Sequence, residues 1–76
     1  MNNKPMNTFA TNLRMQRARL DLSQAQLAAK SGVSMATIGN IEGSKTMPAL
    51  DTMEALAVAL GIRVADLFAE LPEQQT

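Results

Sequence analysis

Residues 27–43, LAAKSGVSMATIGNIEG, contain two runs of helix-forming residues that are separated by Ser31-Gly32. Glycine is favoured just after a helix because that position often needs a left-handed backbone, so Gly32 is expected to end the first run. Ser34 can accept a hydrogen bond from a backbone N–H of the second run and begin a new helix. Ala28 adds little bulk where the two helices should cross. The stretch therefore predicts two short helices joined by a tight turn.

The second of these helices has one bulky side and one bare side. Ile38 and Ile41 are three residues apart and share a face, because each residue turns the helix by about 100°. The opposite side carries Ala36, Gly39, Asn40 and Gly43, with Met35 along one edge. Gly39 costs about 1 kcal/mol relative to alanine inside a helix. Close approach of another surface explains that cost; alternatively, Gly39 is merely tolerated because packing holds the helix.

The composition restricts the kinds of function that the chain can carry. The 76 residues are 46% hydrophobic, with two Phe and no Trp, Tyr, Cys or His, so one small aliphatic core is expected. Disulfides and thiolate metal sites are excluded, and the usual proton shuttle is missing. There is also no phosphate-binding glycine loop and no carboxylate pair in an obvious cleft, so an enzyme is the weakest interpretation. We predict no metal, no cofactor and no small-molecule ligand.

No apolar stretch approaches the roughly 20 residues that a membrane span needs, and the start MNNKPMNTF does not resemble a signal peptide. A cytoplasmic protein without a membrane partner is therefore expected.

The charges are divided unevenly along the chain. Residues 1–45 carry six Lys or Arg and two Asp or Glu, a net charge of +4, whereas residues 46–76 carry one and five, a net charge of −4. This division predicts two electrostatically opposed faces, although ordinary scatter of solvated charge is the alternative.

Helical periodicity extends over most of the chain, and no period-two alternation indicates a strand. We predict an all-α fold, a compact bundle of five helices at residues 8–20, 24–30, 34–42, 50–60 and 64–71. Residues 1–7 are predicted to form a flexible arm, residues 8–71 the domain, and residues 72–76 a flexible tail.

Several short motifs in this order resemble the Cro/repressor-type helix-turn-helix family, the lambda-repressor-like DNA-binding domains. They are Leu22-Ser23-Gln24, Leu27-Ala28, Gly32-Val33-Ser34, Ile38, Ile41-Glu42, Pro48-x-Leu50 and Ala59-Leu60-Gly61-Ile62. The resemblance covers about residues 9–70. It implies a small transcriptional regulator that binds double-stranded DNA in the major groove.

The resemblance also implies roles for individual residues. The base-reading positions are Met35, Ala36, Gly39 and Asn40, of which Asn40 can make a bidentate contact with adenine. The expected contacts with the DNA backbone come from Arg14, Gln24, Lys30, Ser34, Thr37, Ser44, Lys45 and Thr46. Arg17 and Glu42 stand where the family often has a partly buried ion pair; a phosphate contact is the alternative role for Arg17.

The chain departs from the common pattern of the family at three places. Asp21 replaces a glycine, and Gly43-Ser44 reverses the usual order, in which the glycine comes second. Arg63 replaces the Ser or Thr that usually caps the last helix, so a weaker cap is expected there.

One such domain reads only a few base pairs, so we predict a homodimer on a near-palindromic operator. The expected dimer contacts are Val64, Leu67, Phe68 and Leu71, unless these residues only close the core of the monomer. A role in transcriptional repression or control is the first interpretation. The alternative is a protein-interaction module, such as an antitoxin subunit whose main partner is another protein.

Overall fold

The computed structural model describes residues 4–70, and these form four α-helices and one short 3₁₀ helix. The elements are α1 (Lys4–Arg19), α2 (Gln24–Ser31), α3 (Met35–Glu42), α4 (Leu50–Leu60) and the 3₁₀ helix η1 (Val64–Phe68). No strand occurs among residues 4–70. The predicted all-α class is confirmed, but the count of five α-helices is wrong, because the last element is a 3₁₀ turn.

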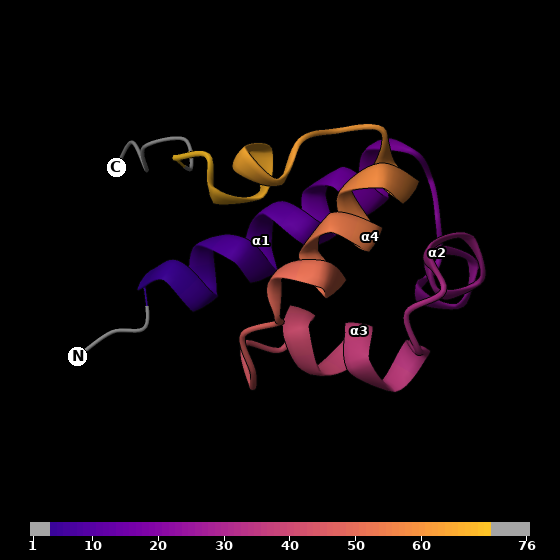
Figure 1. Cartoon of the computed structure of the whole chain (residues 1–76), viewed down its shortest axis with the longest axis horizontal. Helices are drawn as coiled ribbons and strands as arrows, with labels where there is room; N and C mark the ends of the chain where they lie inside the picture. The colour runs from indigo at the N-terminus through magenta and orange to yellow at the C-terminus, as the bar shows by residue number, and fades with distance from the viewer. Residues whose placement is uncertain (1–3, 71–76) are drawn as a thin grey trace.

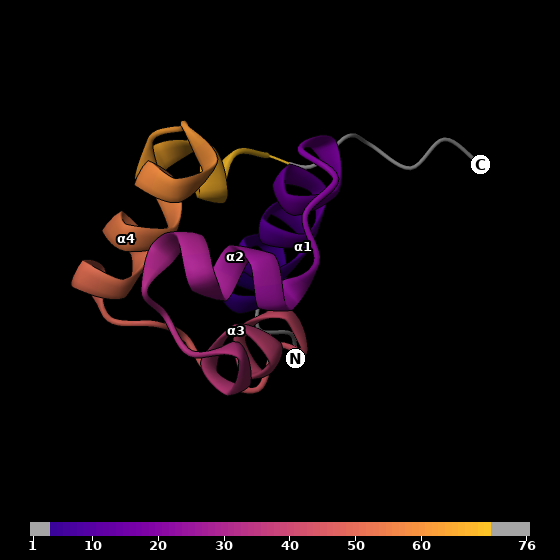
Figure 2. The same cartoon turned by 90° about the vertical axis from the view of Figure 1, so that its right-hand side faces the viewer.

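The arrangement places α3 along one edge of the molecule and η1 near the opposite edge (Figure 1). Figure 2 shows α2 lying across α3, which is seen nearly end-on below it. The long helix α1 packs against α3 and η1, while α2 packs against both α3 and α4. As a result, α3 is supported from behind by α1 and α2 and leaves its outer side uncovered.

The core consists of aliphatic side chains and one phenylalanine ring, contributed by every element. Its largest fully buried members are Phe9, Leu13, Leu27, Ile38, Ile41, Leu56, Leu60 and Leu67. Ala28 is half-buried and packs against this cluster, as expected for a small residue at the crossing of α2 and α3.

Local signals define the two central helices as the sequence predicts. Ser23 and Gln26 form a capping box at the start of α2, where Gln26 N donates to Ser23 Oγ at 3.0 Å and Ser23 N donates to Gln26 Oε1 at 2.8 Å. Gly32 follows α2 with φ 79°, in the left-handed region. Ser34 then caps α3 by accepting from Thr37 N at 3.0 Å.

The first helix starts earlier than predicted. It begins at Lys4 rather than near Thr8, so residues 4–7 belong to α1 and not to a flexible arm. Pro5 lies in the first turn, where the missing N–H of proline has no helical acceptor to lose. Residues 1–3 and the predicted tail, 72–76, lie outside the described residues.

The short η1 is a 3₁₀ turn because its bonds close after three residues, as in Asp66 N to Arg63 O at 2.9 Å. Arg63 provides no side-chain cap, but its backbone N–H donates to Asp66 Oδ2 at 2.9 Å. That hydrogen bond lowers the pKa of Asp66. At the end of the turn, Asn12 Nδ2 of α1 donates to Leu67 O at 3.2 Å and to Ala69 O at 2.9 Å. These carbonyls are thus satisfied from α1.

No helix within residues 4–70 is long and apolar enough to cross a membrane.

Candidate nucleic-acid interface

The outward face of α3 is open to solvent. Met35 is 52% exposed, and Ala36 and Asn40 are also exposed, whereas Ile38 and Ile41 on the opposite side are buried. The structure therefore brings the predicted base-reading residues together on one uncovered surface. We call Met35, Ala36, Gly39 and Asn40 the reading face.

Gly39 lies in the reading face and is half-buried. A Cβ added there would meet only Gln24 Oε1, at 3.9 Å, which is an ordinary van der Waals contact. Packing between α2 and α3 therefore does not require a glycine at this position. The outward side of the backbone at Gly39 is therefore uncovered, which would allow another surface to approach it closely.

The hydroxyl groups at the start of α3 bind each other. Ser34 Oγ lies 2.8 Å from Thr37 Oγ1 and also accepts the Thr37 N–H. Both residues are exposed at the border of the reading face. Their hydroxyl groups already take part in the hydrogen bonds that cap α3.

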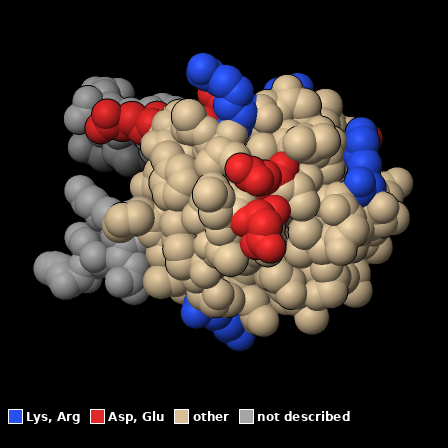
Figure 3. Space-filling view, viewed as in Figure 1, with Lys and Arg blue, Asp and Glu red and all other residues tan. Residues whose placement is uncertain are grey.

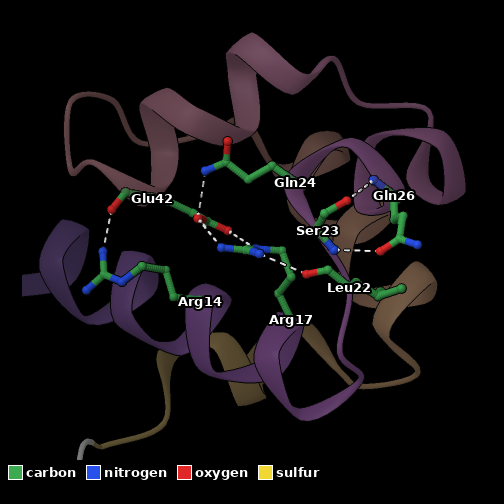
Figure 4. Close-up of polar contacts among 7 residues, drawn as sticks. All are labelled: Arg14, Arg17, Leu22, Ser23, Gln24, Gln26 and Glu42. Carbon is green, nitrogen blue, oxygen red and sulfur yellow. Dashed lines mark hydrogen bonds and ion pairs between the residues drawn. The ribbon is translucent and has the colours of Figure 1, made fainter.

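Glu42, at the end of α3, joins three helices through its carboxylate (Figure 4). Arg17 of α1 donates from Nε to Glu42 Oε2 at 2.8 Å and from Nη2 to Oε1 at 3.0 Å. Gln24 of α2 donates from Nε2 to the same Oε1 at 3.0 Å. The predicted ion pair is thus present, and the hydrogen bonds with Glu42 raise the pKa of the Arg17 guanidinium. Arg17 also donates from Nη1 to Leu22 O at 2.8 Å, so each of its three side-chain nitrogens is bonded to a group inside the protein.

Two further arginines of α1 act on the ends of other helices. Arg14 donates to the main-chain carbonyl of Glu42, the last carbonyl of α3, and to Thr11 Oγ1 at 3.2 Å. Arg19 donates to Leu60 O, the last carbonyl of α4, at 3.1 Å. A cation at a helix C-terminus is favourable because it satisfies carbonyls that have no helical donor. Sequence reasoning missed these roles of Arg14 and Arg19, and that of Asn12, because their partners are 28 to 57 residues away along the chain.

The remaining predicted backbone contacts lie mainly in the loop after α3. Lys45 and Thr46 are exposed there, and Ser44 is half-buried. Lys30 is exposed in the last turn of α2, and Gln24 occupies the first. Within residues 5–70, neither Lys30 nor Lys45 forms a side-chain hydrogen bond or ion pair.

The predicted dimer residues that the structure describes differ in their exposure. Leu67 is fully buried, so it closes the monomer core and is wrong as a contact for a partner. Val64 is half-buried and packs against the core. Phe68 remains 40% exposed and sets its ring against Phe9 in an edge-on geometry, with the ring centroids 5.2 Å apart. Leu71 lies outside the described residues.

Acidic side chains gather over α4 on the face drawn in Figure 3, and basic ones lie at its margins. No group of three or more potential metal-ligating residues occurs within the part of the chain that the structure describes.

The sequence is similar to one protein family and to a phage protein. The Helix-turn-helix family (HTH_3) matches residues 13–67. The immunity repressor protein of Bacillus phage phi105 is 36% identical over 63 residues, which are 83% of this chain and 44% of that protein. The chain thus spans less than half the length of this relative.

Solved structures of similar fold include a controller protein and a hypothetical transcription factor. The restriction-modification controller protein C.AhdI from Aeromonas hydrophila has a TM-score of 0.79 and 33% identity, covering 83% of this chain and 96% of its own. A hypothetical transcription factor, NHTF, from Neisseria has a TM-score of 0.81 and 28% identity, covering 86% of this chain and 75% of its own.

Proposed function

Since the chain belongs to the helix-turn-helix family, we propose that it is a sequence-specific, double-stranded-DNA-binding transcriptional regulator that acts in the cytoplasm. The observation that carries this proposal is the exposed reading face of α3, held from behind by Arg17, Gln24 and Glu42. An α-helix supported in this way fits the major groove, where each base pair presents a distinct pattern of groups. The phage repressor and the controller protein support a role in regulation.

In the proposed complex, contacts with the DNA backbone fix the orientation of α3. Lys45 and Thr46 extend from the loop after α3, and Ser34 and Thr37 flank its start. Arg14 contributes mainly by holding the end of α3, because its guanidinium is already bonded to the Glu42 carbonyl. The cationic contacts with phosphate then fall chiefly to Lys30 and Lys45, which are both exposed.

We further propose that two copies bind a near-palindromic operator, with half-sites about 34 Å apart. The C-terminal surface around Phe68 is the proposed contact between protomers, because it is partly exposed and apolar. It lies near the edge of the molecule opposite α3, so a partner there would leave the reading face open (Figure 1).

A test starts with selection of bound sequences from random DNA duplexes at physiological salt. We expect one enriched, near-palindromic sequence, followed by its specific shift in a gel. Asn40→Ala should weaken binding of that sequence by about 1–3 kcal/mol and leave binding of random DNA unchanged. Equal losses on both kinds of DNA would remove Asn40 from base reading, and absence of any enrichment would refute sequence-specific binding.

A protein-interaction module, such as an antitoxin subunit, is the second candidate. It is favoured by Val58 and Leu50 of α4, which are 80% and 61% exposed beside the acidic Asp51 and Glu54. Binding of this kind would be lost on Val58→Asp, a change that should not affect a DNA complex formed through α3.

A further inference from the structure

The polar groups around the reading face are largely committed to contacts within the protein. Ser34 and Thr37 are bonded to each other, and the Gln24 amide is oriented by its N–H donated to Glu42. Figure 4 shows the Gln24 carbonyl oxygen directed away from Glu42. Arg14 and Arg17 are held by Glu42 as well. Apart from the Gln24 carbonyl oxygen, these groups therefore serve mainly to support the reading face.

The reading face itself offers mostly hydrocarbon. The sequence of α3, MATIGNIE, contains no Lys or Arg, the side chains that most often bind guanine O6 and N7. Within residues 5–70, the Asn40 amide makes no side-chain hydrogen bond, so both its donor and its acceptor remain for a ligand. The Ala36 methyl lies one helical turn before Asn40, and the Met35 thioether chain, which is 52% exposed, lies at the edge of the reading face.

We propose that α3 recognises the 5-methyl group of a pyrimidine through Met35 and Ala36, next to an adenine bound by Asn40. This inference rests on the proposed DNA-binding function and specifies its ligand: an A·T-rich half-site whose thymine methyl is part of the signal. Adenine presents N7 as acceptor and N6 as donor, which matches the two ends of an amide. The thymine methyl is the apolar group of the major groove, and Gly39 lets the helix backbone come close to it.

The same chemistry makes the protein responsive to cytosine methylation. A methyl on C5 of cytosine occupies the same place in the major groove as the thymine methyl. At a position where Met35 and Ala36 supply the contact, 5-methylcytosine should therefore bind better than cytosine. The benefit is that of burying one methyl group, about fourfold in affinity.

The experiment uses a duplex of the sequence selected from random DNA and changes one pyrimidine at a time. Each thymine is replaced by deoxyuridine, which removes only the methyl group, and then by cytosine and by 5-methylcytosine. Dissociation constants are measured by fluorescence anisotropy. We expect at least one thymine per half-site at which deoxyuridine weakens binding about fourfold and 5-methylcytosine exceeds cytosine by a similar factor.

Variants assign this effect to the protein. Met35→Ala should reduce the difference between thymine and deoxyuridine to less than about twofold. The matched control is Met15→Ala, which removes a similarly exposed methionine (47%) from α1 and should keep the full difference. Equal binding of thymine and deoxyuridine duplexes at every position, with discrimination against random DNA retained, would overturn this inference and leave the proposed function standing. Absence of any sequence preference would overturn both.

Discussion

Asp21 and Ser44 adopt a left-handed backbone, with φ of 59° and 60°, although neither is a glycine. Each follows a helix, and the same pattern of two backbone hydrogen bonds surrounds it. After α1, Leu22 N donates to Arg17 O and Asp21 N donates to Ala18 O. After α3, Lys45 N donates to Asn40 O and Ser44 N donates to Ile41 O. This is the Schellman ending, in which glycine is favoured because it carries no Cβ. The sequence departs from its family's glycines at these two places, yet the backbone keeps the conformation that glycine would prefer.

Ser44→Gly is therefore expected to stabilise the protein by about 1 kcal/mol, because it removes the strain of a Cβ in the left-handed region. Urea denaturation followed by circular dichroism measures the difference. Ser44→Ala is the control, since it also removes the hydroxyl but keeps the Cβ, and it should give no gain. Equal stabilisation by both substitutions would show that the hydroxyl, rather than the backbone conformation, is responsible.

The helix α3 is held at its end by contacts from other elements. It has no basic residue in its last turn, and its end is held by Arg14 and Arg17 of α1 and by Gln24 of α2. The Glu42 side chain is only 4% exposed and that of Arg17 21%. The ion pair thus fixes the orientation of α3 relative to α1. Because both side chains are largely buried, the pair is not an ordinary surface ion pair, which would contribute little.

Glu42→Gln should lower the free energy of unfolding by about 2 kcal/mol, because it leaves the partly exposed Arg17 charge without its partner. Replacing both residues, by Arg17→Met and Glu42→Leu together, should recover a large part of that loss, since no unpaired charge remains. Thermal and urea denaturation of the single and double variants form the test. A double variant no more stable than Glu42→Gln would contradict this account.

The elements also show what a sequence can predict and what it cannot. The starts of α2 and α3 follow from the caps Ser23 and Ser34, and the ends of α2 and α4 follow from the glycines Gly32 and Gly61. The form of η1 was not predictable, because Asn12 binds its last carbonyls from 55 and 57 residues away. The reading face was predictable because it depends on the period of one helix. The capping by Arg14 was not, because it depends on how two helices pack.

On the scale of the whole molecule, α3 and η1 lie toward opposite edges (Figure 1), and α1 contacts both of them. The fully buried Leu67 anchors η1 to the core, while Phe68 is left 40% exposed at the surface. If two protomers contact each other through Phe68, neither reading face takes part in that contact. This arrangement suits a protein that must present two helices to one face of DNA.

Phe68→Asp tests this arrangement, because a carboxylate in an apolar contact would separate the protomers. We expect a folded monomer in sedimentation velocity and an operator affinity reduced about 100-fold or more, since each half-site is then bound singly. Circular dichroism must show retained helicity, because Phe68 also packs on Phe9. Val58→Asp introduces the same charge at a position 80% exposed on α4 and should leave the dimer intact. An unchanged dimer with Phe68→Asp would exclude this contact, and a monomer with Val58→Asp would move the interface to α4.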